Sequence, residues 1–175
     1  TGVRGMVLKD GDEVISLSIL HRSGATQEDR EEYLRFAPWK PEKEGEMRDQ
    51  ERFNMMREHE QFILTVCANG YGKLSSAYDY RRTNRGGQGI TNIDNIGRNG
   101  PVVASFAVVH DDHLMLVTDQ AKLIRMGLST MRVIGRNSAG VRLFNVADNE
   151  HVVSAARIED NDEDEAEGAT TEASE

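Results

Sequence analysis

The sequence lacks several features that mark particular classes of protein. Its single cysteine, Cys67, excludes an internal disulfide, and the apolar stretch around it favours a buried structural thiol over a nucleophile. No run approaches the roughly 20 apolar residues of a membrane-spanning helix, and no signal peptide opens the chain. We therefore expect a cytoplasmic protein with no membrane partner.

Residue groups suited to catalysis or metal binding are also missing. No nucleophile, base and orienting group stand at useful spacing, which disfavours an independent enzyme. His110 and His113 flank two aspartates, but they lie between apolar runs and favour a solvated hairpin turn over a metal site. We predict that this chain contains no catalytic residue, no metal ligand and no cofactor site.

The net charge of −9 is concentrated in two segments. Residues 159–175 hold nine acids and no base, and residues 26–61 hold eleven acids and seven bases. Subtracting both from the chain's 30 acids and 21 bases leaves 10 acids and 14 bases, a net charge of +4. The body of the chain is therefore basic. Residues 159–175 have almost no apolar side chains, which predicts a disordered acidic tail. This tail either serves solubility alone or competes with an anionic ligand for the basic residues.

The basic segment Lys73–Ile90 carries three arginines beside a glycine-rich turn. Glycine lets the backbone turn where a Cβ would clash, and fixed positive charge beside such a turn suits phosphate. A P-loop over Gly72 and Lys73 would need glycine where Cys67 stands, and a dinucleotide fingerprint from Gly87 would need glycine at Asn92. The segment thus indicates phosphate binding without a nucleotide-binding motif.

A weaker copy of this segment follows, and a shortened one opens the chain. The matched positions are Lys73 and Lys122, 49 residues apart, together with Arg85 and Arg136 and Gly89 and Gly140, both 51 apart. Gly2 matches Gly140 and Val14 matches Val152 at one shared offset of 138. Repeats near fifty residues made of short strands are typical of propeller-like arrays of four-stranded blades.

These repeats predict an all-β fold built from antiparallel blades. We assign residues 1–25 to the end of a truncated blade, 62–106 to a complete blade and 107–158 to a terminal blade. The first assignment places strands at Val3–Leu8 and Val14–Leu20, joined by the turn Lys9–Asp12. Because the chain starts without methionine and partway through a repeat, we interpret it as a fragment of a longer protein.

Residues 26–61 interrupt the repeat. The interval from Gly2 to Gly89 is 87 residues against 51 for the next one, so about 36 residues are inserted. We predict a charged surface excursion containing a polar helix within Glu46–His59, with Phe53 and Met56 on one side. Trp39 either docks on a blade face or contacts a partner.

The repeats resemble the family of DNA gyrase C-terminal domains, six-bladed β-pinwheels around whose rim DNA is wrapped. The residues that carry the resemblance are Asn69–Lys73, Tyr80–Arg82, Arg85–Gly89, Met131–Arg136, Gly140–Arg142 and, at the start of the chain, Thr1–Gly5. The hallmark box of the family, Gln-Arg-Arg-Gly-Gly-x-Gly, would fall at Thr83–Gly89, where Thr83 and Asn84 replace the Gln and the first Arg. This copy is thus a degenerate relative of the box, and the corresponding domain of topoisomerase IV remains the alternative.

The resemblance implies non-sequence-specific binding and wrapping of double-stranded DNA by a segment with no chemistry of its own. Its partners would be the gyrase B protein and the rest of the gyrase A protein in an A2B2 assembly, whose other domains use ATP and Mg²⁺ to introduce negative supercoils. The candidate DNA-binding residues are Lys73, Arg81, Arg82, Arg85, Gln88, Arg98, Lys122, Arg125, Arg132, Arg136 and Arg142, and the turn glycines are Gly86, Gly87, Gly89 and Gly140. A propeller-like protein-interaction module would also explain the repeats and Trp39, but it would not need bases at matched positions.

Overall fold

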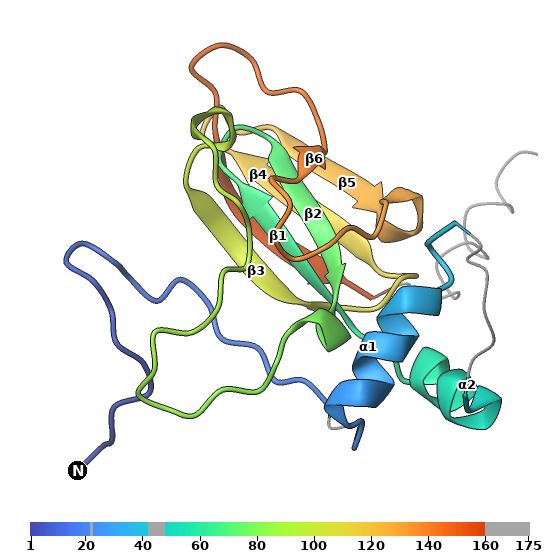
Figure 1. The fold of residues 1–175 in the computed structure, drawn as a ribbon. Helices are drawn as coiled ribbons and strands as arrows, with labels where there is room; N and C mark the ends of the chain where they lie inside the picture. Colours follow the sequence, from blue (N-terminus) through green and yellow to red (C-terminus); the bar gives the residue numbers. More distant parts are fainter. Residues whose placement is uncertain (22, 42–47, 160–175) are drawn as a thin grey trace, which may run out of the picture.

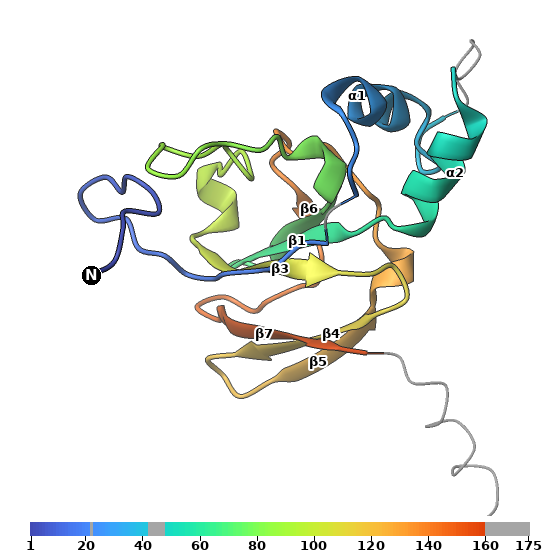
Figure 2. The ribbon, with the colours of Figure 1, turned by 90° about the horizontal axis from the view of Figure 1, so that it is seen from below.

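Two antiparallel β-sheets pack face to face, with a pair of helices at one end and an extended N-terminal segment at the other (Figures 1 and 2). The computed structural model describes residues 1–21, 23–41 and 48–159. The predicted tail, apart from Glu159, lies outside the described residues. The all-β fold class predicted from the repeats is confirmed.

The first sheet has four strands in the order β3-β1-β2-β6. Their bounds are β1 Phe62–Cys67, β2 Tyr71–Ser76, β3 Val102–Val108 and β6 Val141–Arg142. A tight turn at Asn69 and Gly70 joins β1 to β2, and Gly70 has a φ of 78°. The backbone of Gly70 therefore adopts a conformation that a residue with a Cβ rarely takes.

The second sheet has three strands in the order β5-β4-β7. Their bounds are β4 His113–Thr118, β5 Leu123–Gly127 and β7 Val152–Ile158. The prediction of a four-stranded terminal blade is wrong for the described residues, because β6 pairs with β2 of the first sheet instead. Tyr71 lies opposite Arg142 and Gly72 opposite Val141 in that pairing.

The two sheets repeat each other at the predicted spacing. β1 begins at Phe62 and β4 at His113, and the short 3-10 helices Ala77–Asp79 and Leu128–Thr130 also stand 51 positions apart. A third 3-10 helix, Gly97–Asn99, precedes β3. Equivalent segments thus follow β2 and β5, and these segments carry the matched arginines and glycines.

Apolar residues on alternate positions of the strands form the core between the sheets. Leu64 and Val66 of β1 and Leu114 and Leu116 of β4 are completely buried in one cluster. A strand points successive side chains to opposite faces, so this spacing of two places them on the same side. Burying each contributes roughly 1.5–3 kcal/mol relative to exposure.

The N-terminal segment contains the predicted turn but not the predicted strands. The backbone N–H of Asp12 donates to the Lys9 carbonyl at 3.0 Å, whereas Val3–Leu8 and Val14–Leu20 form only one isolated bridge, from Met6 to Gly87. Val14–Leu20 lies beside the edge of β3, but it bonds to the backbone of β3 through side chains rather than through its own backbone. Ser16 Oγ donates to the carbonyl of Ser105 at 2.5 Å, and no ladder forms.

The insertion folds as two helices, α1 Gln27–Phe36 and α2 Gln50–Glu58. α2 confirms the helix predicted within Glu46–His59, with Met56 buried, while α1 was not predicted. Its N-terminus is a capping box, in which Thr26 and Asp29 bond each other's backbone N–H groups. Trp39 docks on the blade, since its ring packs edge-on against Phe62 at 5.6 Å.

The turn between β3 and β4 is only partly solvated. Asp112 is 2% exposed, accepts the backbone N–H of Val109 at 2.7 Å and pairs with Arg157 at 2.7 Å. Asp112 therefore holds the turn against β7, which corrects the expectation of a solvated turn.

Within the described ranges, no three His, Cys, Asp or Glu residues are grouped so that they could hold a metal ion. None of the described helices is long and apolar enough to cross a bilayer.

Candidate nucleic-acid interface

The arginine loop, residues 81–89, leaves the end of β2 through the 3-10 helix Ala77–Asp79. Every residue of this loop is exposed. Gly86 and Gly89 have φ values of 77° and 75°, whereas Gly87 lacks a positive φ and bridges Met6. The turn thus keeps Arg81, Arg82, Arg85 and Gln88 at the surface.

Polar contacts, most of them partly buried, fix the two ends of the arginine loop. The hydroxyl of Tyr80 donates to the side-chain oxygen of Asn92, and the Asn92 amide donates to Thr65 Oγ1 at 2.8 Å. Burial raises the pKa of Tyr80 to about 12, so its hydroxyl keeps the hydrogen that it donates. The guanidinium of Arg136 donates to the carbonyl of Thr91. The loop therefore projects from a rigid base.

Lys73 lies in a different environment from the one predicted. Its side chain in β2 is completely buried, and its ammonium donates to the carbonyls of Gly135, at 3.1 Å, and Arg136. Burial lowers the pKa of Lys73 to about 8, although nearby Asp79 opposes this shift. Lys73 is therefore not placed to meet a phosphate. Instead it secures the loop that carries Arg136 to β2.

That second loop, residues 131–140, packs along β2 and against the base of the first. Ser75 Oγ donates to the carbonyl of Ile134 at 2.8 Å, and the carbonyl of Ser138 accepts the N–H of Asp94 at 3.1 Å. Arg132 is exposed and Arg136 is half-buried. Gly140 ends the loop with a φ of 82°. The structure therefore brings Arg136 to the base of the arginine loop.

Arg98 and Arg142 meet at the ring of Tyr71. Their guanidinium carbons lie 5.0 and 5.2 Å from the ring centre, within cation–π distance. Arg142 also donates to the Tyr71 hydroxyl at 2.7 Å. The side-chain amide of Asn69 donates to the Arg98 carbonyl at 3.0 Å, which holds that arginine from behind. Two cations 44 positions apart in the sequence are thus held together at the start of β2.

The remaining candidates lie on the second sheet and are already engaged. Lys122 pairs with the buried carboxylate of Glu150 at 2.6 Å, and this bond helps to lower the pKa of Glu150 to about 2. Arg125 Nε donates to Nδ1 of His113 at 2.9 Å across β4 and β5. Both side chains are exposed, but they do not join the cluster around Tyr71.

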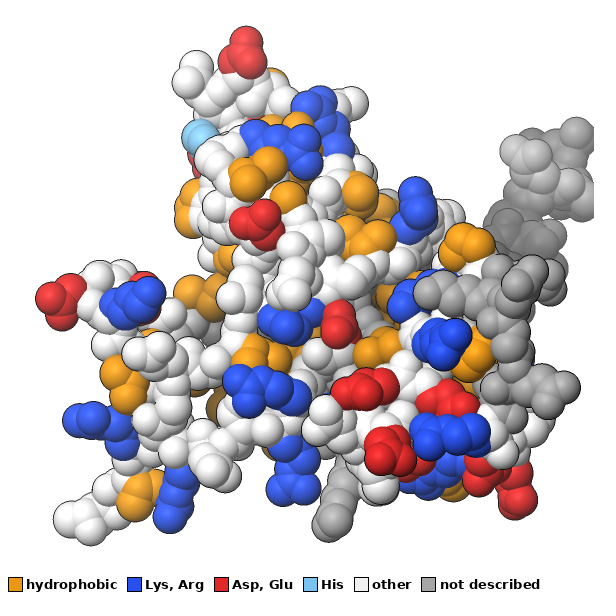
Figure 3. All heavy atoms as spheres, in the orientation of Figure 1, with side chains coloured by type: hydrophobic (Ala, Val, Ile, Leu, Met, Phe, Trp, Pro, Cys, Tyr) orange, Lys and Arg blue, Asp and Glu red, His pale blue; other side chains and the backbone are white. Residues whose placement is uncertain are grey.

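Basic groups are distributed more widely over the surface than acidic ones. Figure 3 shows lysine and arginine side chains over the sheets, the loops and the helices, while the largest group of acidic side chains lies around α1 and α2. Nine of the eleven predicted contact residues are exposed, the exceptions being Arg136 and Lys73. Exposed guanidinium groups on fixed loops can bind successive phosphates without reading the bases.

Sequence reasoning missed three residues that position this surface: Tyr71, Tyr80 and Asn92. Tyr71 stands between Gly70 and Gly72, but nothing near it in the chain predicts its contacts with Arg98 and Arg142. Asn92 joins the loop to β1 and β3 through Thr65 and Ser105. These contacts depend on strand pairing, which places residues distant in sequence side by side.

Comparison with known proteins agrees with this architecture. The sequence model of the family described as DNA gyrase C-terminal domain, beta-propeller, matches residues 1–21, 61–108 and 112–159. The DNA gyrase A protein of Rickettsia bellii is 46% identical, and the match covers 93% of this chain and 20% of that protein. The chain therefore spans about a fifth of the length of the curated relatives it matches.

Two solved structures share the fold. The structure of a DNA gyrase A C-terminal domain matches with a TM-score of 0.52 and 28% identity over 55% of this chain and 33% of that chain. The C-terminal domain of a DNA topoisomerase IV also matches with a TM-score of 0.52, at 17% identity over 57% of this chain and 31% of that chain. The second likeness concerns the fold alone.

The repeated antiparallel sheets, with a glycine turn and arginines after the second strand of each repeat, define an array of propeller-type blades. One family model matches all three segments of the chain that carry these repeats. The chain belongs to the DNA gyrase C-terminal domain family.

Proposed function

We propose that this segment binds double-stranded DNA without sequence preference and wraps it around its basic rim, as the C-terminal part of a gyrase A protein. The observation that carries the proposal is the rigid support of the exposed arginine loop, together with Arg98 and Arg142 at Tyr71. Side chains held in this way bind phosphate with little further loss of conformational freedom.

Electrostatics supports a nucleic-acid ligand despite the net charge of −9. Outside residues 26–61 and 159–175 the chain carries 14 bases and 10 acids. Phosphate contacts release condensed counterions, so affinity should fall steeply with salt, with a slope of about −0.9 per contact. Bending a duplex costs on the order of 1–6 kcal/mol for a site of about 20–30 base pairs, which several such contacts can offset.

In the whole protein this segment would supply the curved path of the DNA. The gyrase B protein and the other domains of the gyrase A protein, in an A2B2 assembly, would perform ATP-dependent and Mg²⁺-dependent strand passage and introduce negative supercoils. The segment itself would need no cofactor and no catalytic residue. We place this activity in the bacterial cytoplasm, on the nucleoid.

Plasmid retardation at low and then raised salt tests the binding. Replacing Arg81, Arg82 and Arg85 with alanine in the full-length protein should weaken binding to any duplex and flatten the salt slope by up to about 3. Relaxing a closed plasmid with a type I topoisomerase in the presence of the protein tests the wrapping. A shift of linking number of one sign is expected, and the triple variant should reduce it.

The matched control removes the same charge from the insertion, by changing Arg35, Lys40 and Arg57 to alanine. All three side chains are exposed, and they lie on or beside α1 and α2. This variant should retain most of the affinity and the linking-number shift. Equal losses of affinity in the two triple variants would mean that net charge alone drives binding. Binding to selected DNA sequences only would contradict recognition of the DNA backbone.

A further inference from the structure

A cavity of about 490 Å³ lies where the insertion meets the segment that follows β2 of the first sheet. Its walls come from the segment before α1, from α1 itself, from the end of α2 and from the residues after β2. Its volume falls within the roughly 300–1,000 Å³ typical of ligand sites. The arginine loop begins at its rim, because Arg82 is one of the lining residues.

Two arginines and two histidines line the cavity, and they come from both parts of the fold. His21, Arg30 and His59 come from the insertion and its approach, and Arg82 comes from the arginine loop. No acidic side chain is among the described residues that line it. This distinguishes the cavity from the outer face of α1, where Glu28, Glu31 and Glu32 line a hollow with Arg35 and Arg48. A site of this composition suits an anion.

Arg30 is held in place on the inner side of α1. Its Nε donates to the Thr26 carbonyl at 3.3 Å, and one terminal nitrogen donates to the Tyr80 carbonyl at 3.2 Å. These bonds engage two of the five N–H groups of the guanidinium, which leaves capacity for an anion. Tyr80 directly precedes Arg81 and Arg82, so Arg30 stands beside the start of the arginine loop.

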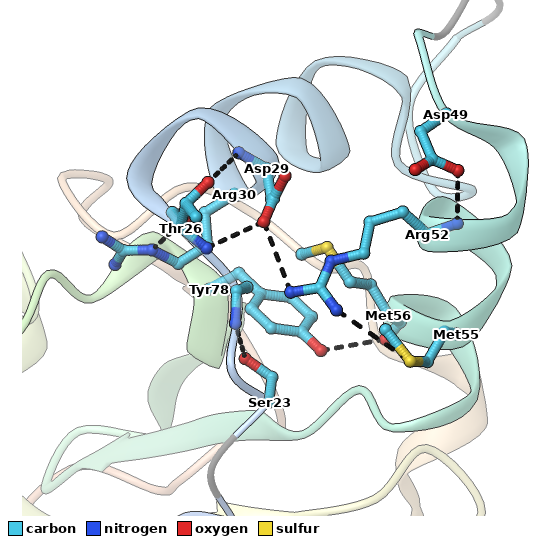
Figure 4. Close-up of polar contacts among 10 residues, drawn as sticks. Ser23, Thr26, Asp29, Arg30, Asp49, Arg52, Met55, Met56 and Tyr78 are labelled. Carbon is cyan, nitrogen blue, oxygen red and sulfur yellow. Dashed lines mark hydrogen bonds and ion pairs between the residues drawn. The ribbon is translucent and has the colours of Figure 1, made fainter.

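The insertion is packed firmly enough to keep this wall in position. The hydroxyl of Tyr78 donates to the Met56 carbonyl at 3.0 Å, and the rings of Tyr33 and Tyr78 meet edge to face at 5.0 Å. The N–H of Ala77 donates to the Gln61 carbonyl at 2.8 Å. Figure 4 shows Arg30 on α1 and Met56 on α2 on either side of Tyr78. A preorganised wall lowers the entropic cost of binding.

We propose that this cavity is a second phosphate site, in which Arg30 of the insertion and Arg82 of the arginine loop together hold a backbone phosphate of the bound duplex, with His21 and His59 at the edge. The inference rests on the proposed DNA binding and assigns the insertion a part in it. The insertion thereby extends the path of the DNA from the blade onto α1.

The test compares two arginines on the same helix in the full-length protein. Arg30→Gln should weaken binding to a random-sequence duplex by roughly threefold to tenfold at low salt and lower the salt slope by about 0.9. Arg30→Lys, which keeps the charge, should retain most of the slope. Arg35→Gln is the matched control, and it should leave both quantities unchanged. Circular dichroism and thermal melting check that each variant is folded.

A double-mutant cycle separates a direct contact from an indirect one. In a background with Arg81 and Arg85 changed to alanine, a direct phosphate contact predicts that Arg30→Gln still lowers the affinity and the slope. If its effect disappears in that background, Arg30 acts only by holding Tyr80, and the second site is refuted. An unchanged affinity of Arg30→Gln in the intact background refutes it as well. If the wild-type protein fails to bind duplex at all, the proposed function fails first.

Discussion

The hydroxyl of Tyr71 accepts a hydrogen bond of 2.7 Å from Arg142, whose guanidinium carbon also lies 5.2 Å from the centre of the tyrosine ring. One side chain thus offers Arg142 an aromatic face and an acceptor at once. Arg98 uses the same ring at 5.0 Å. Without Tyr71, the two positive charges would have no common support.

Tyr71 should therefore act as a positioning residue for DNA binding. Tyr71→Leu removes the ring, and we expect the affinity for duplex to fall about twofold to fivefold per arginine released, in keeping with exposed cation–π contacts of about 0.5–1 kcal/mol. Tyr71→Phe keeps the ring and should lose less. Fluorescence anisotropy with a labelled duplex measures both. A Tyr71→Leu protein that is folded and binds like the wild type would contradict this role.

Glu60 should make stability depend on pH. Its carboxylate accepts hydrogen bonds from Tyr33 and, at 2.6 Å, from Ser76, but burial raises its pKa from 4.5 to about 7. Between these values the folded state binds more protons than the unfolded state, so the free energy of unfolding falls as pH rises, by at most about 1.4 kcal/mol per pH unit. Urea unfolding from pH 4.5 to 7.5 should show this decline, and Glu60→Gln should remove its share. If the plots of unfolding free energy against pH for the wild-type protein and for Glu60→Gln run parallel, Glu60 does not titrate in this pH range.

Gly140 should tolerate no side chain. It has a φ of 82°, and a Cβ there would stand 2.6 Å from the carbonyl oxygen of Gly72. Gly140→Ala should destabilise the fold by more than about 1 kcal/mol, since the strain adds to the contact. Gly97→Ala is the control, because a Cβ at Gly97 meets nothing within 4 Å. Thermal unfolding compares the two, and equal melting temperatures would refute the prediction.

The repeat pattern predicted the fold because its signals are local. The turn at Asn69 and Gly70 and the 51-residue spacing of β1 and β4 follow from residues that need positive φ and from alternating apolar positions. α1 could also have been predicted, since Thr26 and Asp29 form a recognisable capping box. Local structure could thus largely be predicted from the sequence.

The parts that could not be predicted depend on distant partners. Lys73 matches Lys122 in the repeat, yet Lys73 is buried under Gly135 and Arg136, whereas Lys122 is exposed and paired with Glu150. Their surroundings differ because the loop from the second repeat covers β2. Val14–Leu20 has the apolar alternation of a strand but bonds to the edge of β3 through side chains. Neither outcome can be inferred from one segment alone.

The pairing of β6 with β2 links the stability of one repeat to the presence of the next. If residues 141–142 were removed, Tyr71 and Gly72 would sit on a bare strand edge with unsatisfied backbone groups, open to pairing with another molecule. The sheet of the repeat at residues 62–106 is thus completed by a strand that the following repeat contributes. A truncation inside the last repeat would consequently also expose the edge of the sheet before it.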